Sequence, residues 1–155
     1  TSLARALFAF NSANAEGWGM YAESVMQQYL PFDAQLFSLY NRLFRAARIF
    51  LDPMVNTGQL TAKEAEDFLV EQLGMSRAMA RSDAQRYAFR EPGQATSYYY
   101  GYMSIMRLRT EVEIALGDDF NQREFHDFVI EQGFLPPELL RTAVLEKFVT
   151  QLKKD

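Results

Sequence analysis

Helix start and stop signals recur along the whole chain, and they limit its fold more than any other feature. Thr61-Ala62-Lys63-Glu64 is a capping box, in which Thr61 and Glu64 each satisfy a free backbone N–H of the other at the start of a helix. Gly74 stands where that helix is expected to end, because glycine adopts the left-handed conformation that commonly follows a last helical turn. Alternating β-branched runs, which would indicate half-buried strands, are absent from the sequence. The chain is therefore predicted to be all-α.

Apolar residues at three- and four-residue spacing predict the remaining helices. The first apolar stripe begins with Leu3, Leu7 and Phe8. Residues 16–29 continue this stripe, and the expected helices after them cover residues 33–51, 61–73, 76–89, 94–116, 121–133 and 136–152. Pro31 is expected to end the stripe, Asp33 to cap the helix over 33–51, and Pro53 with Gly58 to break or close that helix.

The spacing of these helices predicts one domain over residues 1–155, with about seven helices in all. Their connections are short, and neither an internal repeat nor a low-complexity linker is visible. Because the chain starts at Thr1 and enters a helical pattern at once, we expect it to be a piece of something longer.

The composition argues against several classes of function. The 155 residues carry 16 basic and 20 acidic side chains, for a net charge of −4, whereas a nucleic-acid partner normally needs a basic face. There is no cysteine, which rules out disulfides, zinc–thiolate sites and cysteine nucleophiles. No run of about 18 apolar residues is present, so we expect no membrane span. The cellular compartment stays open.

Glu16-Gly17-Trp18-Gly19-Met20-Tyr21-Ala22-Glu23 is the segment with the clearest chemical content, and it holds the only tryptophan. Glu16 and Glu23 are close to two helical turns apart, so they share one helix face. Burying an unpaired carboxylate is costly, so a cation, an arginine partner or solvent must account for each of them. The candidate arginine partners are Arg42, Arg45 and Arg48. Since His126 is the only histidine, a complete zinc site of two histidines and a glutamate is impossible within these residues.

A tyrosine-rich stretch is the second segment with candidate chemistry. Gln94, Tyr98, Tyr102 and Met106 follow one another at four-residue steps and share a helix face. A tyrosine hydroxyl that points into a cleft can donate a hydrogen bond to a developing oxyanion, and the alternative is packing at the rim of the core. His126 is likewise either a hydrogen-bonded structural residue or a proton donor near a site.

Five motifs follow one another in a characteristic order. They are Glu16-Gly17-Trp18-Gly19-Met20-Tyr21-Ala22-Glu23, Arg45-Ala46-Ala47-Arg48 with Asp52, Arg86-Tyr87, Pro92-Gly93-Gln94-Ala95 with Ser97-Tyr98 and Gly101, and Phe125-His126-Asp127. In the second motif, Arg48 and Asp52 have the spacing of an i, i+4 ion pair. The set resembles a bacterial family catalogued as domain of unknown function 885, over about Ala15 to Phe148.

The resemblance implies a longer, mostly helical protein that binds zinc. Upstream, members of the family carry a segment like H-E-x-x-P-G-H, which is similar to metallopeptidase helices in which two histidines bind zinc and the glutamate is the general base. It further implies that Glu16 is the third zinc ligand. Tyr98 is the first candidate, and Tyr102 the second, for holding substrate and stabilising the oxyanion. An exported or periplasmic location is compatible with this resemblance.

The sequence departs from the family pattern at three places. The histidine helix is absent from these residues, so the chain corresponds to the C-terminal part of the pattern. Asn56 stands where most members have a histidine, and Gly19-Met20 replaces an Ala-Leu pair.

Two hypotheses follow for the function. In the first, the chain is the C-terminal half of a zinc-dependent peptidase-like hydrolase, whose partners are the missing N-terminal half and a peptide-like substrate. Glu16, Tyr98 and His126 should then line one concave surface, and the isolated chain should bind no zinc and be inactive. In the second, it is a non-catalytic helical binding or scaffold module. Under either hypothesis, an uncovered apolar face would favour a homo-oligomer. The candidate faces are the stripe of Leu3, Leu7 and Phe8, and the tyrosine-rich face.

Overall fold

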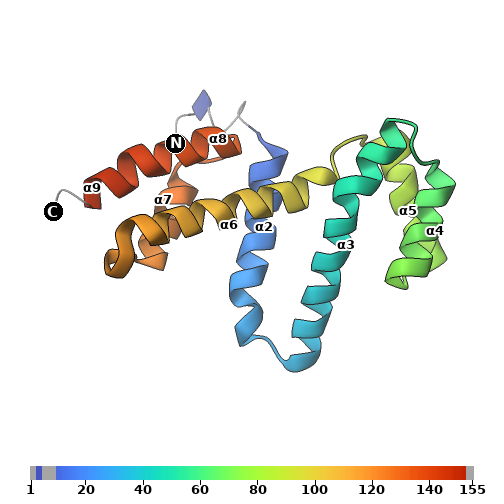
Figure 1. Ribbon diagram of the computed structural model, residues 1–155, viewed down its shortest axis with the longest axis horizontal. Helices are drawn as coiled ribbons and strands as arrows, with labels where there is room; N and C mark the ends of the chain where they lie inside the picture. The colour runs from blue at the N-terminus through green and yellow to red at the C-terminus, as the bar shows by residue number, and fades with distance from the viewer. Residues whose placement is uncertain (1–2, 5–9, 153–155) are drawn as a thin grey trace. The chain divides into compact units, whose positions relative to one another are not determined.

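Helices are the only regular elements in the part of the chain that the computed structural model describes, residues 3–4 and 10–152. The all-α prediction is confirmed. Seven α-helices of seven residues or more agree with the predicted number. They are α2 (Ser12–Met26), α3 (Phe32–Asn56), α4 (Ala62–Leu73), α5 (Arg77–Gln85), α6 (Thr96–Leu116), α7 (Gln122–Glu131) and α8 (Pro137–Ala143) (Figure 1). The shorter elements are two 3-10 turns (Gln27–Tyr29 and Gly117–Asp119), two π-helical segments (Arg86–Arg90 and Val144–Val149) and α9 (Thr150–Leu152).

The predicted caps of α4 are confirmed in detail. Thr61 accepts a hydrogen bond from the Glu64 backbone N–H, and the Glu64 carboxylate accepts one from the Thr61 backbone N–H at 2.7 Å. Gly74 follows the helix with a φ of 66°, in the left-handed region. Ser76 and Asn121 cap α5 and α7 in the same way, with side-chain oxygens that accept backbone N–H groups.

The predicted start of α3 is wrong, and its predicted end is confirmed in part, because Gly58, with a φ of 73°, follows the last turn. The helix begins at Phe32 with Pro31 at the N-cap, so Asp33 lies in the first turn instead of capping it. Pro53 does not break the helix, which continues to Asn56. The side-chain amide of Asn56 holds the last turn in place, because it donates to the Asp52 carbonyl at 2.9 Å and to the Tyr87 carbonyl at 3.2 Å. These bonds offset the one backbone bond that Pro53 cannot donate.

The fold consists of two compact units, each with its own core. Unit 1 comprises Thr1–Tyr21 and Gly101–Asp155, and unit 2 comprises Ala22–Tyr100. The division falls inside α2 and inside α6, so each of these helices contributes to both units. The predicted single domain over residues 1–155 stays a prediction.

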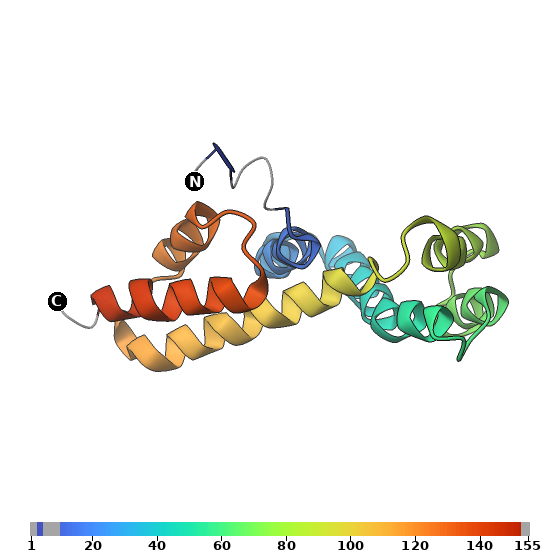
Figure 2. The ribbon, with the colours of Figure 1, turned by 90° about the horizontal axis from the view of Figure 1, so that it is seen from above.

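The core of unit 1 packs apolar side chains of α6, α7 and α8, with those of the π-helical segment that follows α8. These are Leu108, Val112, Leu116, Phe125, Val129, Leu140, Val144, Phe148 and Val149. Figures 1 and 2 both show the C-terminal part of α6 running beside α8 and its continuation. Trp18 of α2 packs against this core, and it thereby attaches α2 to the unit.

The core of unit 2 is built largely from small residues. Its buried members are Ala47, Leu51, Ala65, Leu69, Met75, Ala80, Ala84, Tyr87 and Ala95. Five of these nine are alanine, which lets α4 pack closely against both α5 and α3. At the edge of this core, the buried Glu66 carboxylate is paired with Arg77 at 3.0 Å and with Arg81 at 3.3 Å.

Apolar side chains are exposed along α3. Phe32, Leu36, Leu39 and Leu43, at alternating four- and three-residue spacing, are 46–79% exposed. Of the stripe predicted at the N-terminus, Leu3 is exposed, while Leu7 and Phe8 lie outside the described residues. Formation of a homo-oligomer through that stripe or through the tyrosine-rich face stays a prediction. None of the helices over residues 3–4 and 10–152 has the length and hydropathy needed to cross a membrane.

Candidate functional site

Glu16 and Glu23, on the same helix, have different surroundings. The Glu23 carboxylate accepts a hydrogen bond from the Ser38 hydroxyl at 2.9 Å and pairs with the Arg45 guanidinium at 3.4 Å. Glu16 is partly buried, and within residues 3–4 and 10–152 no hydrogen bond or ion pair to its carboxylate is found. Glu23 therefore has the arginine partner that was predicted, whereas Glu16 has none among residues 3–4 and 10–152.

A complete metal site is not formed by the described part of the chain. Nowhere in it do three histidine, aspartate or glutamate side chains gather into a group that would hold a metal ion. Zinc sites in proteins usually have three or four protein ligands, so Glu16 would contribute one ligand of several.

The glycine after Glu16 is required by helix packing in unit 1. A Cβ atom on Gly17 would lie 2.3 Å from the carbonyl carbon of Gly101, and one on Gly101 would lie 1.8 Å from the carbonyl oxygen of Ala13. The backbones of α2 and α6 therefore touch directly at this crossing, which two glycines permit. The crossing fixes the position of Glu16 and Trp18, the neighbours of Gly17, in unit 1.

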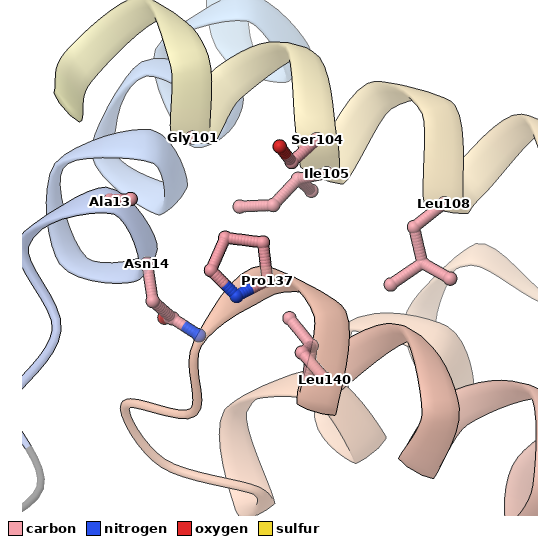
Figure 3. Close-up of a pocket in the computed structure, with 8 residues that line it drawn as sticks. All are labelled: Ala13, Asn14, Gly101, Ser104, Ile105, Leu108, Pro137 and Leu140. Atoms are coloured by element: carbon pink, nitrogen blue, oxygen red, sulfur yellow. The ribbon is translucent and has the colours of Figure 1, made fainter. Parts of the chain in front are cut away.

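A small cavity lies beside this crossing, where α2, α6 and α8 meet. Figure 3 shows Pro137 and Leu140 of α8 facing Ile105 and Leu108 of α6 across it. The Asn14 side-chain amide donates to the carbonyl of Leu135 at 2.7 Å. The cavity volume of about 10 Å³ leaves room for about one water molecule, so this cavity is a packing gap and no substrate pocket.

His126 lies in a cluster of aromatic and polar side chains in unit 1. Its Nε2 is 2.7 Å from the Tyr21 hydroxyl, and the Arg109 guanidinium donates to the same hydroxyl at 3.3 Å. The rings of Trp18 and Tyr21 both stand nearly perpendicular to the imidazole, with interplanar angles of 89° and 84°. The Glu16–Glu23 segment thus supplies two of the side chains that surround the only histidine.

His126 makes the stability of this unit depend on pH. Burial lowers the pKa of His126, the positive charge of Arg109 lowers it further, and Asp127 opposes both. The unfolded chain, with an ordinary histidine pKa of about 6.5, therefore binds a proton more readily than the folded chain. The folded unit therefore keeps its full free energy of unfolding above about pH 6.5. This free energy decreases as the pH falls through the lowered pKa of His126.

We therefore expect the free energy of unfolding to fall between about pH 7.5 and pH 5.5 by more in the wild type than in His126→Gln, since glutamine cannot take up the proton. Urea titrations followed by the fluorescence of Trp18, which packs against His126, measure the difference. An equal fall in the two proteins would contradict this assignment.

Tyr98 lies in the first turn of α6 between two arginines of unit 2. Its ring centre is 5.3 Å from the guanidinium carbon of Arg48 and 5.8 Å from that of Arg86. Burial lowers the pKa of Arg86, but Tyr98 and Glu91 together outweigh burial, and the pKa lies above its ordinary value. Each arginine is also paired with a carboxylate, Arg48 with Asp83 and Arg86 with Glu91, so the ring of Tyr98 lies beside two ion pairs.

Asp52 fixes the turn that precedes Tyr98. Its fully buried carboxylate accepts the backbone N–H of Gly93 at 2.8 Å and that of Ala95 at 2.9 Å. The side-chain amide of Asn56 donates to the same carboxylate at 2.8 Å. This carboxylate therefore holds the loop at the start of α6.

The predicted ion pair between Arg48 and Asp52 is wrong. Arg48 donates through two nitrogens to Asp83, at 2.9 and 3.1 Å, and the Tyr87 hydroxyl donates to Asp83 at 2.6 Å. The two-pronged geometry of guanidinium and carboxylate accounts for this choice, and the oxygens of Asp52 are occupied by backbone donors. Burial, reinforced by the negative charge of Asp83, raises the pKa of Tyr87 far above its usual range.

The remaining candidate, Tyr102, is 7% exposed on α6 in unit 1. Glu16 and His126 belong to the same unit, whereas Tyr98 belongs to unit 2. The concave surface shared by Glu16, Tyr98 and His126 therefore stays a prediction.

Sequence reasoning missed Tyr21 and Arg109 as functional candidates. The aromatic motif contains Tyr21, but no spacing rule connects residues 21, 109 and 126, which come from three helices. Only the packing of α2, α6 and α7 brings these side chains together.

Comparisons with known proteins agree with this architecture. A family model described as "Bacterial protein of unknown function (DUF885)" matches residues 1–144. The crystal structure of a candidate lipoprotein from Colwellia psychrerythraea is similar over 93% of this chain, with a TM-score of 0.83 and 30% sequence identity. This chain spans 24% of that protein, about a quarter of its length. No curated protein matches the chain.

Proposed function

Because this chain belongs to the bacterial DUF885 family, we propose that it is the C-terminal part of a zinc-dependent, peptidase-like hydrolase. It would contribute one carboxylate ligand and several hydrogen-bonding side chains to a site completed by residues outside this sequence. The chain spans about a quarter of its structural relative, which is compatible with such a division.

The observation that carries this proposal is the difference between Glu16 and Glu23. A partly buried carboxylate normally has a hydrogen-bonding or cationic partner. Glu23 has Ser38 and Arg45, whereas Glu16 has no such partner in the described part of the chain. A metal ion held jointly with ligands from elsewhere in a longer protein would satisfy it. Zinc bound there would supply Lewis-acid chemistry.

The other candidates would act on the substrate and on the charge that develops during hydrolysis. Tyr98, whose ring lies near Arg48 and Arg86, is suited to donate a hydrogen bond to a carbonyl oxygen on which negative charge develops. His126 would contact the substrate through its imidazole. Tyr102 is the second tyrosine candidate, and its burial makes a direct substrate contact depend on the surroundings in the longer protein.

The test is the zinc content of the full-length protein that contains this chain. Wild type should bind about one zinc ion per chain by elemental analysis, and Glu16→Gln should lose most of it, because one ligand of three is removed. Glu23→Gln is the matched control, since it changes the paired carboxylate on the same helix and should retain the metal.

Unchanged zinc content in Glu16→Gln would refute the ligand role. A full-length protein that binds no zinc at all would instead favour a non-catalytic helical module. The isolated 155-residue chain should bind no stoichiometric zinc, because it holds one of the ligands only.

A further inference from the structure

Two side chains from two neighbouring helices determine which nitrogen of His126 carries its proton. Arg109, on α6, has only donor groups, and it donates through one terminal nitrogen to the hydroxyl oxygen of Tyr21, on α2. The same hydroxyl lies 2.7 Å from Nε2 of His126, on α7. Each of these contacts needs a donor and an acceptor, so their directions are linked.

The contact with Arg109 sets the direction at Tyr21. An oxygen that accepts a hydrogen bond from a cation becomes a weaker acceptor, and its own O–H becomes a stronger donor. Burial raises the pKa of Tyr21 above its ordinary value, with Arg109 opposing, so the hydroxyl keeps its proton at neutral pH. Tyr21 therefore donates to Nε2, and Nε2 accepts.

Arg109 is itself held in place. Its Nε donates to Glu113 at 2.7 Å, and its second terminal nitrogen donates to Gln122 at 3.0 Å. The resulting chain of contacts runs from Glu113 through Arg109 and Tyr21 to His126. Since Nε and the second terminal nitrogen of the guanidinium both have acceptors, the orientation of the first terminal nitrogen toward Tyr21 is fixed.

The imidazole ring is held from its sides as well. Trp18 packs edge-on at 5.6 Å between ring centres, and Phe125 lies at 5.9 Å. Rotation of the ring that would exchange its two nitrogens would disturb both contacts and the Tyr21 hydrogen bond. The ring nitrogen that faces away from Tyr21 is Nδ1, and no hydrogen bond to it is found among residues 3–4 and 10–152.

We propose that Tyr21 and Arg109 are positioning residues that hold His126 as its Nδ1–H tautomer, so that the ring offers an N–H donor to an acceptor oxygen of a ligand. A peptide carbonyl is such an oxygen, and that identification rests on the proposed function. In this state His126 is no general base, because the Nε2 lone pair is occupied by Tyr21. It acts by hydrogen bonding to charge on the ligand.

Among residues 3–4 and 10–152, the charged and titratable groups that act on this ring are Tyr21 and Arg109, with Asp127 on its own helix. Protonation of His126 at acidic pH would place a hydrogen on Nε2 and would oblige the Tyr21 hydroxyl to turn away. The tautomer is therefore a property of the neutral ring, and it has to be measured above about pH 7.5.

The tautomer can be read directly, because His126 is the only histidine of the chain. Long-range proton–nitrogen spectra of the 15N-labelled 155-residue chain, without a histidine tag, should show Nδ1 with the shift of a protonated nitrogen and Nε2 with that of an unprotonated one. In Tyr21→Phe the two shifts should move toward the Nε2–H tautomer, which is favoured by free histidine, and Arg109→Gln should move them part of the way. Tyr29→Phe, which changes an exposed tyrosine, should leave them unchanged.

An Nε2–H tautomer in the wild type would overturn the proposal, and this outcome needs no variant to fold. Wild-type shifts retained in a folded Tyr21→Phe chain would overturn the role of Tyr21. Neither result depends on zinc. The tautomer measurement therefore stays valid even if Glu16 is shown not to bind the metal.

Peptide hydrolysis by the full-length protein tests the role of the donor. His126→Gln keeps an N–H group and should retain several-fold more activity than His126→Phe. An equal loss of activity in the two variants would overturn the donor role. That result is expected if His126 is a general base, because neither substitute can accept a proton. If the full-length protein hydrolyses no peptide, the proposed function fails, and the spectra alone decide the tautomer.

Discussion

Gly101→Ala is expected to lower the free energy of unfolding of unit 1 by at least about 2 kcal/mol, as for a strongly overpacked core. The added Cβ would lie 1.8 Å from the carbonyl oxygen of Ala13, which is backbone and cannot rotate away. α2 and α6 would have to separate, and the contacts that Trp18 makes with the core and with His126 would loosen. This cost exceeds the roughly 0.5–1 kcal/mol that alanine normally gains over glycine within a helix.

The matched control is Gly19→Ala on α2, where a Cβ would meet no atom within 4 Å. That variant should be neutral or more stable, by up to about 1 kcal/mol. Urea unfolding followed by Trp18 fluorescence measures both, because the only tryptophan lies beside the crossing. Equal stability of the two variants would show that the helices do not meet at Gly101.

Asp52→Ala is expected to cost about 2–4 kcal/mol in unit 2, because hydrogen bonds to a charged group contribute roughly 1.5–3 kcal/mol each and the desolvation of the carboxylate offsets part of the total. The variant leaves the buried N–H of Ala95 and the N–H of Gly93 without their acceptor. The turn before α6 should then open, and Tyr98 should lose its fixed position between Arg48 and Arg86.

Amide hydrogen exchange gives a local measurement of this effect. The Gly93 and Ala95 amides should lose protection in Asp52→Ala by more than the amides of α4 do. Asp52→Asn should have a smaller effect, because its amide oxygen accepts one of the two N–H groups. Asp33→Ala, at an exposed position in the first turn of the same helix, should change stability by less than about 1 kcal/mol. Unchanged exchange at Gly93 and Ala95 would contradict the role of Asp52.

The two substitutions change the stability of different units, so their effects on unfolding can be distinguished. Gly101→Ala acts on the crossing of α2 and α6 in unit 1, and Asp52→Ala acts on the turn held by α3 in unit 2. If the units unfold independently, each variant should shift one transition and leave the other in place. A single unfolding transition that both variants shift would mean that the two units unfold as one cooperative body.

Much of the helical framework was predictable because its signals are local. Thr61 and Glu64 form the capping box that their spacing predicts, and Gly74 adopts the left-handed conformation expected after a helix. The exception is α3, which passes through Pro53 because Asn56 is bonded to the Tyr87 carbonyl, 31 residues away in sequence. A contact at that distance leaves no mark in the local pattern.

The candidate site was predictable only in its parts. The sequence indicated that Glu16 and Glu23 need partners, but it did not indicate that Ser38 and Arg45 both bind the carboxylate of Glu23. It also proposed that Arg48 pairs with Asp52, whereas the structure pairs it with Asp83 on α5. Spacing along one helix gives the residues that share a face, but a neighbouring helix decides which of them receive a partner.

The sequence by itself determined the all-α class, most helix boundaries, the absence of cysteine chemistry and the presence of a single histidine, because each depends on composition or on interactions within a few residues. The tertiary structure decided why Gly17 and Gly101 are glycines, which carboxylates are paired, and how Tyr21 and Arg109 reach His126. These features depend on the close approach of helices that are far apart in the chain, and that approach is set by packing.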